Sequence, residues 1–150
     1  MTLGRRLAIA ALAGSLAAGL GGCAAPHSSL GTPSSRCFKA LPAAERAVHH
    51  QGRLLGIRLS STTKVVKLAQ RLGWSAGSVT PSELPGPPAS TVRPLCVAAF
   101  KGRFNPDQVA GAWAGSTAGS YAVVVVSPSG DGPVRSFVVA HLPVHFHHLV

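Results

Sequence analysis

Three short apolar runs in the second half of the chain constrain its fold most. They are rich in β-branched residues and cover 95–100 (LCVAAF), 121–126 (YAVVVV) and 136–140 (SFVVA). Runs of this length and content are typical of strands. Because the apolar residues are nearly continuous instead of alternating, we expect these strands to be central in a sheet or buried on both faces. The turn cluster at 128–133 (PSGDGP) predicts an antiparallel hairpin between the last two runs.

A first helix is expected over residues 41–52, ahead of these strands. Pro42 suits the first helical turn, and Glu45 lies near the positive N-terminal end. Gly52 suits the position directly after a helix. The next segment, 53–59 (RLLGIRL), is ambiguous and could form a strand.

Residues 60–72 give the clearest helical pattern. Ser61 or Thr62 can cap its start, and Gly73 is expected to end it. Its apolar and basic side chains separate onto two faces at helical spacing: Val65, Leu68, Ala69 and Leu72 on one, and Lys64, Lys67 and Arg71 on the other. The basic face is either an ordinary solvated surface or a contact for an anionic surface, where each basic residue contributes roughly 1 kcal/mol.

The connecting segments complete the predicted architecture. Residues 77–94 contain five prolines, and each proline removes an N–H donor and fixes φ, so no regular element is expected there. Residues 105–112 predict one or two helical turns with Asn105 as the cap. The predicted fold class is therefore α+β, with short N-terminal helices packed on a small antiparallel sheet that is a meander in the C-terminal half.

The start of the chain follows a different pattern. Arg5 and Arg6 precede 14 uncharged, mostly apolar residues, 7–20, which is the layout of a secretory signal. That run is shorter than the roughly 20 residues needed to span a bilayer. The tetrapeptide that follows, Leu20-Gly21-Gly22-Cys23, resembles the lipobox of bacterial lipoproteins. The resemblance implies that the Cys23 thiol accepts diacylglycerol and that Cys23 becomes the first residue of the mature chain.

Three parts of the chain follow from this resemblance. Residues 1–22 are expected to be a signal peptide, 23–35 the lipidated cysteine with a flexible tether, and 36–150 a single domain. The tether is uncharged and rich in Ser, Pro, Gly and Ala, and a flexible segment of its length reaches roughly 20 Å. The implied location is the extracytoplasmic face of the cell membrane, held by acyl chains that together give stable anchoring.

The two remaining cysteines, Cys37 and Cys96, are expected to form a disulfide, because an exported chain enters an oxidising compartment. The bond would close a loop of about 60 residues and contribute roughly 4 kcal/mol in the chain-entropy model. The alternative is a reactive thiol pair. No C-x-x-C spacing is present to support it.

The charge of the chain narrows the range of functions that it could have. After residue 22 the chain has twelve Lys and Arg residues and four acids, a net charge of +8. Such scarcity of carboxylates disfavours calcium sites, magnesium–phosphate sites and paired-carboxylate glycosidases. Nucleic acid is not an expected partner of an exported chain that lacks clustered aromatic platforms.

Residues 73–77 (GWSAG) match G-x-S-x-G, the nucleophile elbow of α/β-hydrolases, with Ser75 in the centre. Asp107 or Asp131 and then His141 follow in the order of a catalytic triad. The elbow needs a strand before the serine and a helix after it, whereas here a helix is expected before it and a proline-rich loop after it. The flanking segments favour a helix-ending glycine followed by a tryptophan that packs on the core.

Histidines gather at the end of the chain, at His141, His145, His147 and His148. Imidazole is a good ligand for copper and zinc, and residues two apart in a strand point the same way. His49 and His50 could complete a set if the first helix packs nearby. The alternative is a chance cluster, since no carboxylate that could orient the imidazoles lies nearby in the sequence.

Together these patterns predict a lipid-anchored, exported, non-catalytic binding or accessory module of the cell envelope. Its expected partners are the membrane, through diacylglycerol on Cys23, and an anionic lipid, a wall polymer or an envelope protein. The alternatives are a copper- or zinc-binding protein that uses the C-terminal histidines and, more remotely, a small serine hydrolase.

Overall fold

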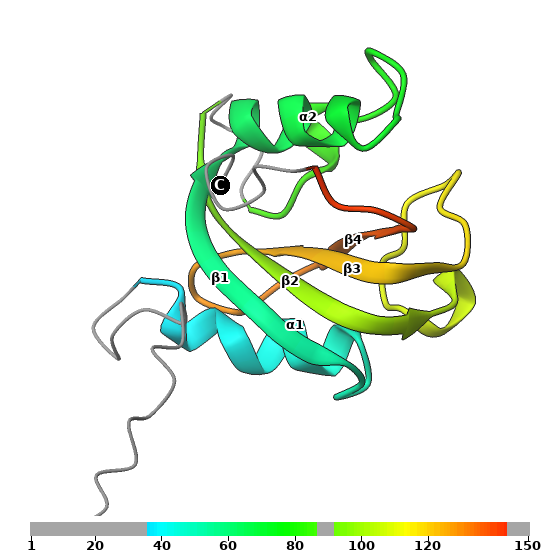
Figure 1. The fold of residues 1–150 in the computed structure, drawn as a ribbon. Coiled ribbons are helices and arrows are strands. Elements are labelled where there is room, and N and C mark those ends of the chain that lie inside the picture. Colours follow the sequence, from blue (N-terminus) through cyan, green and yellow to red (C-terminus); the bar gives the residue numbers. More distant parts are fainter. Residues whose placement is uncertain (1–35, 87–91, 144–150) are drawn as a thin grey trace, which may run out of the picture.

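The computed structural model describes residues 36–86 and 92–143 of the chain. Its centre is an antiparallel sheet of four strands in the order β1-β2-β3-β4, with α1 on one face and α2 on the other (Figure 1). This is the predicted α+β class. In chain order the elements are η1 (Phe38–Ala40), α1 (Leu41–Ala47), β1 (Arg53–Ser61), α2 (Thr62–Arg71), η2 (Pro81–Glu83), β2 (Pro94–Phe104), η3 (Pro106–Gln108), β3 (Gly119–Val126) and β4 (Arg135–Val139).

The ambiguous segment after the first helix forms strand β1. It pairs antiparallel with β2, so that Ile57 lies opposite Ala98 and Leu59 opposite Cys96. The meander therefore contains four strands, and its first strand comes from between the two helices. An irregularity in the pairing between Leu54 and Gly56 breaks the alternation of side chains, which explains why the sequence pattern was ambiguous.

The apolar runs are buried on both faces of the sheet, as predicted. Successive side chains of a strand point to opposite faces, and here each face has its own cluster of buried side chains. The cluster on the α1 face includes Ala98, Phe100, Ala122, Val124 and Val138. The cluster on the α2 face includes Val97, Ala99, Val123, Val125 and Phe137.

The first helix is shorter than predicted. It ends at Ala47, and His49 and His50 then adopt left-handed backbone conformations with φ of 52° and 56°. Gly52 is therefore not the residue directly after the helix. Its role is close approach to β2, because a Cβ at Gly52 would lie 2.9 Å from the carbonyl oxygen of Lys101.

The second helix closely follows its sequence signals. The Ser61 hydroxyl accepts a hydrogen bond from the backbone N–H of Lys64 at 3.4 Å and caps the start. Val65, Leu68 and Ala69 are buried against the sheet, and Gly73 follows the helix with φ of 101°. Neither this helix nor any other in the described parts of the chain is long and apolar enough to cross a membrane.

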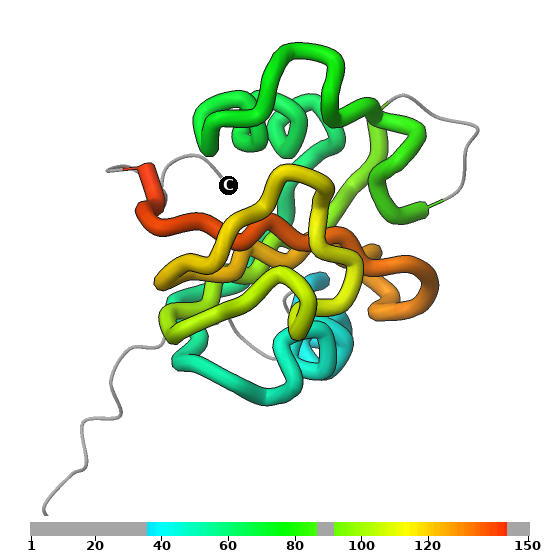
Figure 2. The backbone as a smooth tube through the Cα atoms, turned by 90° about the vertical axis from the view of Figure 1, so that its right-hand side faces the viewer, coloured from blue at the N-terminus to red at the C-terminus, as the bar shows by residue number. Residues whose placement is uncertain are grey.

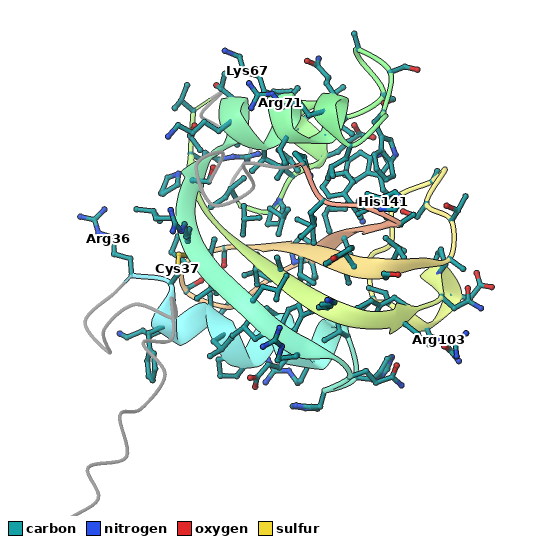
Figure 3. All side chains as sticks on the ribbon, viewed as in Figure 1. Arg36, Cys37, Lys67, Arg71, Arg103 and His141 are labelled. Carbon is teal, nitrogen blue, oxygen red and sulfur yellow. A yellow bond between two sulfur atoms is a disulfide. The ribbon has the colours of Figure 1, made fainter. Side chains whose placement is uncertain are left out.

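A disulfide joins Cys37 to Cys96, as predicted, with the two Cα atoms 5.5 Å apart. Cys37 lies directly before η1, and Cys96 lies in β2, so the bond ties the start of the domain to the sheet. Both cysteines are buried in the cluster on the α1 face. Figure 3 shows Cys37 beside the start of the first helical turn.

The segment after η3 lies along the outer edge of β4. The backbone N–H of Ser136 donates to the carbonyl of Gly111, and the N–H of Trp113 donates to the carbonyl of Ser136, both at 2.8 Å. A Cβ at Gly111 would lie only 2.0 Å from the carbonyl oxygen of Val134, so only glycine fits this close approach. Figure 2 shows this segment, in yellow-green to yellow, beside the orange-red β4.

Candidate functional site

The C-terminal end of α2 borders an open cleft of about 660 Å³. Three segments that are far apart in the sequence form it: 71–78 from the last residue of α2 onwards, 114–117 after η3, and 138–143 from the end of β4 onwards. This volume lies within the range of about 300–1,000 Å³ that is usual for small-molecule sites. The cleft is the candidate site.

Trp74 fixes two of these segments together. Its Nε1–H donates to the carbonyl of Ala114 at 3.1 Å. Its ring makes a T-shaped contact with Phe137 of β4, with 5.0 Å between ring centroids and 71° between planes. The half-buried indole therefore cannot swing freely, because a hydrogen bond and a ring contact both position it.

Phe137 extends this contact into the core of the α2 face. It stacks on Trp113 at a centroid distance of 5.6 Å, and the Arg135 guanidinium lies 5.5 Å from the Trp113 ring centroid. We call Trp74, Phe137 and Trp113 the aromatic cluster. It forms a rigid support behind one wall of the cleft.

The polar groups of the cleft are positive or neutral. Arg71 and His141 line it, and both are solvent-exposed. Within the described chain, neither side chain has a hydrogen-bond or ion-pair partner. None of the chain's four acidic residues is among the lining residues; hydroxyl groups are supplied instead by Ser75, Ser78 and Thr117.

The serine of the G-x-S-x-G motif lies in this cleft without the context of a nucleophile elbow. Helix α2 precedes Ser75, and the short turn η2 follows it, so the strand–serine–helix order is absent. The structure does place Ser75 and His141 on the same cleft. Asp107, in η3, and Asp131, between β3 and β4, do not line it. The expected packing of Trp74 on the core is confirmed.

The basic face of α2 is present as expected. Lys64, Lys67 and Arg71 are all exposed, and Figure 3 shows Lys67 and Arg71 on the side of the helix that points away from the sheet. Of the three, Arg71 alone lines the cleft.

The metal and lipid predictions fall largely on parts of the chain that the structure does not describe. Cys23, His145, His147 and His148 lie outside the described residues. Within residues 36–86 and 92–143, no group of three or more His, Cys, Asp or Glu side chains could hold a metal ion. The turn with His49 and His50 follows α1, which covers the opposite face of the sheet from α2.

A capped turn organises the loop that leads away from the cleft. One carboxylate oxygen of Glu83 accepts hydrogen bonds from the Thr80 hydroxyl at 2.7 Å and from the Thr80 backbone N–H at 2.9 Å. These bonds lower the pKa of Glu83 below its ordinary value of 4.5, and the nearby Arg135 adds to the effect. The Nε–H of Arg135 in turn donates to the Glu83 carbonyl at 3.1 Å.

Arg93 is a structural residue that the sequence patterns did not reveal. It is 5% exposed, and its guanidinium donates to the carbonyls of Gly86 at 3.1 Å and Leu84 at 3.2 Å, and also to that of Pro81. The cleft itself was also missed, because residues 113–117 carry no periodic signal and nothing in the sequence places them beside α2.

No protein-family model, no curated protein and no solved structure matched this chain. We therefore infer the function of this chain from its own residues.

Proposed function

We propose that this chain is a lipid-anchored exported protein whose domain acts as a non-catalytic binding or accessory module of the cell envelope. The observation that carries the proposal is the lipobox-like Leu20-Gly21-Gly22-Cys23, placed directly after a signal-type apolar run. The anchor sets the location of the domain, and residues 24–35 set its reach.

The Cys37–Cys96 disulfide supports an exported location. Structural disulfides persist in oxidising compartments and are rare where cellular thiols are kept reduced. A buried disulfide that ties η1 to the central sheet fits a domain that folds after export.

The cleft supports a binding role over a catalytic one. Ser75 and His141 line it, but no described carboxylate lies there to orient the imidazole. A serine nucleophile ordinarily needs a base that a third group positions. Binding requires only the shape and the polar groups that are present.

The anchor is tested by growing cells that express the chain with labelled palmitate, with and without a lipoprotein signal-peptidase inhibitor. In the wild-type chain we expect incorporation of the label, and slower migration when the inhibitor is present. In Cys23→Ala we expect neither. Ser29→Ala, a tether substitution that keeps the lipobox, is the matched control and retains both. If Cys23→Ala and the wild-type chain are labelled equally, or migrate equally with the inhibitor, the anchor is refuted.

Export is tested separately by thiol alkylation in acid-quenched cells. Cys37 and Cys96 are expected to resist alkylation until a reductant is added. In a chain that lacks residues 2–22 and stays inside the cell, both thiols are expected to react. Free thiols in the unmodified chain would argue against an exported location.

A further inference from the structure

We propose that the cleft between α2, residues 114–117 and the end of β4 binds a small organic anion with a flat apolar body, taken from the aqueous side rather than from the anchoring membrane. The ligand chemistry follows from the cleft alone. Its aqueous source rests on the proposed lipid anchor.

Charge indicates the anionic group. Arg71 carries a permanent positive charge, and His141 offers an N–H donor in either protonation state. Both side chains lack protein partners within the described chain. Arg71 stands at the rim of the cleft and points away from the sheet in Figure 3, so it can turn to a ligand without first breaking an ion pair. Because no acidic side chain is among the described lining residues, a carboxylate, phosphate or sulfonate meets attraction from Arg71 and no opposing charge from these residues.

The walls indicate the apolar body. Leu72, Val139 and Leu142 contribute apolar surface, and Trp74 presents an aromatic side chain whose position is fixed by Ala114 and Phe137. A fixed aromatic wall costs little conformational entropy on binding and favours flat partners through ring stacking. Hydroxyls on the same lining, such as Thr117, can orient polar substituents.

The arrangement of the domain indicates the aqueous side. Residues 23–35 join the domain at Arg36, and Figure 3 shows Arg36 and His141 on opposite sides of it. The reach expected from the sequence of this tether, roughly 20 Å, is less than the roughly 30 Å diameter of a small domain. The side with Arg36 is therefore expected to face the membrane, and the cleft is expected to face away from it.

The proposal is tested with the intact, lipid-anchored chain in phosphatidylcholine nanodiscs. The probes are 6-fluoro-2-naphthoate and its neutral amide, followed by ¹⁹F NMR line broadening, with empty nanodiscs to correct for partitioning. We expect the acid to bind at least fivefold more tightly than the amide. Equal affinity for acid and amide, or binding of neither, would overturn the proposal.

Matched variants of α2 locate the binding. Arg71→Gln should weaken naphthoate binding at least fivefold, whereas Lys67→Gln, the same charge loss on the same helix but outside the cleft, should change it less than twofold. Thr117→Trp, at an exposed lining position, should fill the cleft and abolish binding. Equal losses in Arg71→Gln and Lys67→Gln would mean that only net charge matters and would contradict a cleft site.

Changing the lipid composition of the nanodisc tests whether the bound anion comes from solution or from a lipid headgroup. If the cleft faces away from the membrane, replacing part of the phosphatidylcholine with anionic phosphatidylglycerol should leave naphthoate affinity unchanged within twofold. Competition by phosphatidylglycerol would show that the cleft takes lipid headgroups. Naphthoate binding does not require acyl groups, so failure of the Cys23 labelling test and failure of this test are distinguishable.

Discussion

The two faces of the sheet are built in different ways. On the α1 face, Ala40, Ala43, Ala44 and Ala47 are buried, so a short helix with small side chains approaches the strands closely, and a disulfide ties its start to β2. On the α2 face, the core is made of leucines, valines and the aromatic cluster. Helix α2 covers part of that face, loops cover more, and the cleft lies where they meet.

This difference suggests that the α1 face mainly serves stability and that the α2 face carries the proposed binding site. A helix of seven residues is marginal alone, and the alanines that it buries against the sheet each bury little apolar area. The covalent bond compensates for both on the α1 face. Helix α2 instead buries Val65 and Leu68, and the segments beside its C-terminal end line the cleft.

The largest expected effect comes from breaking the disulfide on the α1 face. Replacing both Cys37 and Cys96 by Ala should lower the free energy of unfolding by about 4 kcal/mol, because the bond closes a long loop in the unfolded chain. Urea denaturation measures this. A loss below about 1 kcal/mol would show that α1 packing holds that face without the bond.

Gly111→Ala, beside β4 on the side that carries Trp113, should have the next largest effect. The free energy of unfolding should fall by about 2–3 kcal/mol, because φ is 63° and the added Cβ meets the Val134 carbonyl. Gly132→Ala is the control, since its φ is 87° but nothing lies within 4 Å of the added Cβ. Thermal denaturation of both variants separates the steric clash from backbone strain. Equal losses would argue against a tight approach at Gly111.

Trp74→Phe should have a smaller effect on global stability, about 1 kcal/mol, because it removes the hydrogen bond to the Ala114 carbonyl and keeps an aromatic ring. Hydrogen exchange is the sharper readout. We expect faster exchange in residues 73–78 and 114–117 and unchanged exchange around α1. Faster exchange around α1 as well would contradict the view that the cleft side can loosen without affecting the α1 face.

The smallest effect concerns Glu83, whose pKa is lowered by its hydrogen bonds to Thr80. A carboxyl with a lowered folded pKa stabilises the fold above its unfolded value, and this contribution is lost as the pH falls through the folded value. Glu83→Gln should therefore lower Tm slightly at pH 7 and progressively less below about pH 4. A Tm difference that is constant with pH would contradict this role.

The sheet was predictable because its signals are local. The apolar runs and the turn at 128–133 determine β2 to β4, and spacing with a serine cap determines α2. Strand β1 was not determined, because Gly56 and the irregular pairing beside it disrupt the alternation. The end of α1 was misplaced because Gly52 is a typical helix-ending residue whose actual role is contact with β2.

The cleft was not predictable for a physical reason. Its walls come from three segments between residues 71 and 143. They are joined by contacts such as Trp74 to Ala114, which are 40 residues apart, and no sequence period reports contacts of that kind. The G-x-S-x-G motif did identify Ser75, which lies in the cleft, but through a resemblance whose structural context is absent.

Intact-protein mass spectrometry of the chain purified from its own membranes tests the central claim most directly. The account predicts one mass that corresponds to residues 23–150 with lipid on Cys23 and two hydrogens missing from the Cys37–Cys96 pair. A chain that begins elsewhere, or carries no lipid, would contradict the anchor. A lipidated chain with both thiols reduced would contradict the disulfide-dependent α1 face.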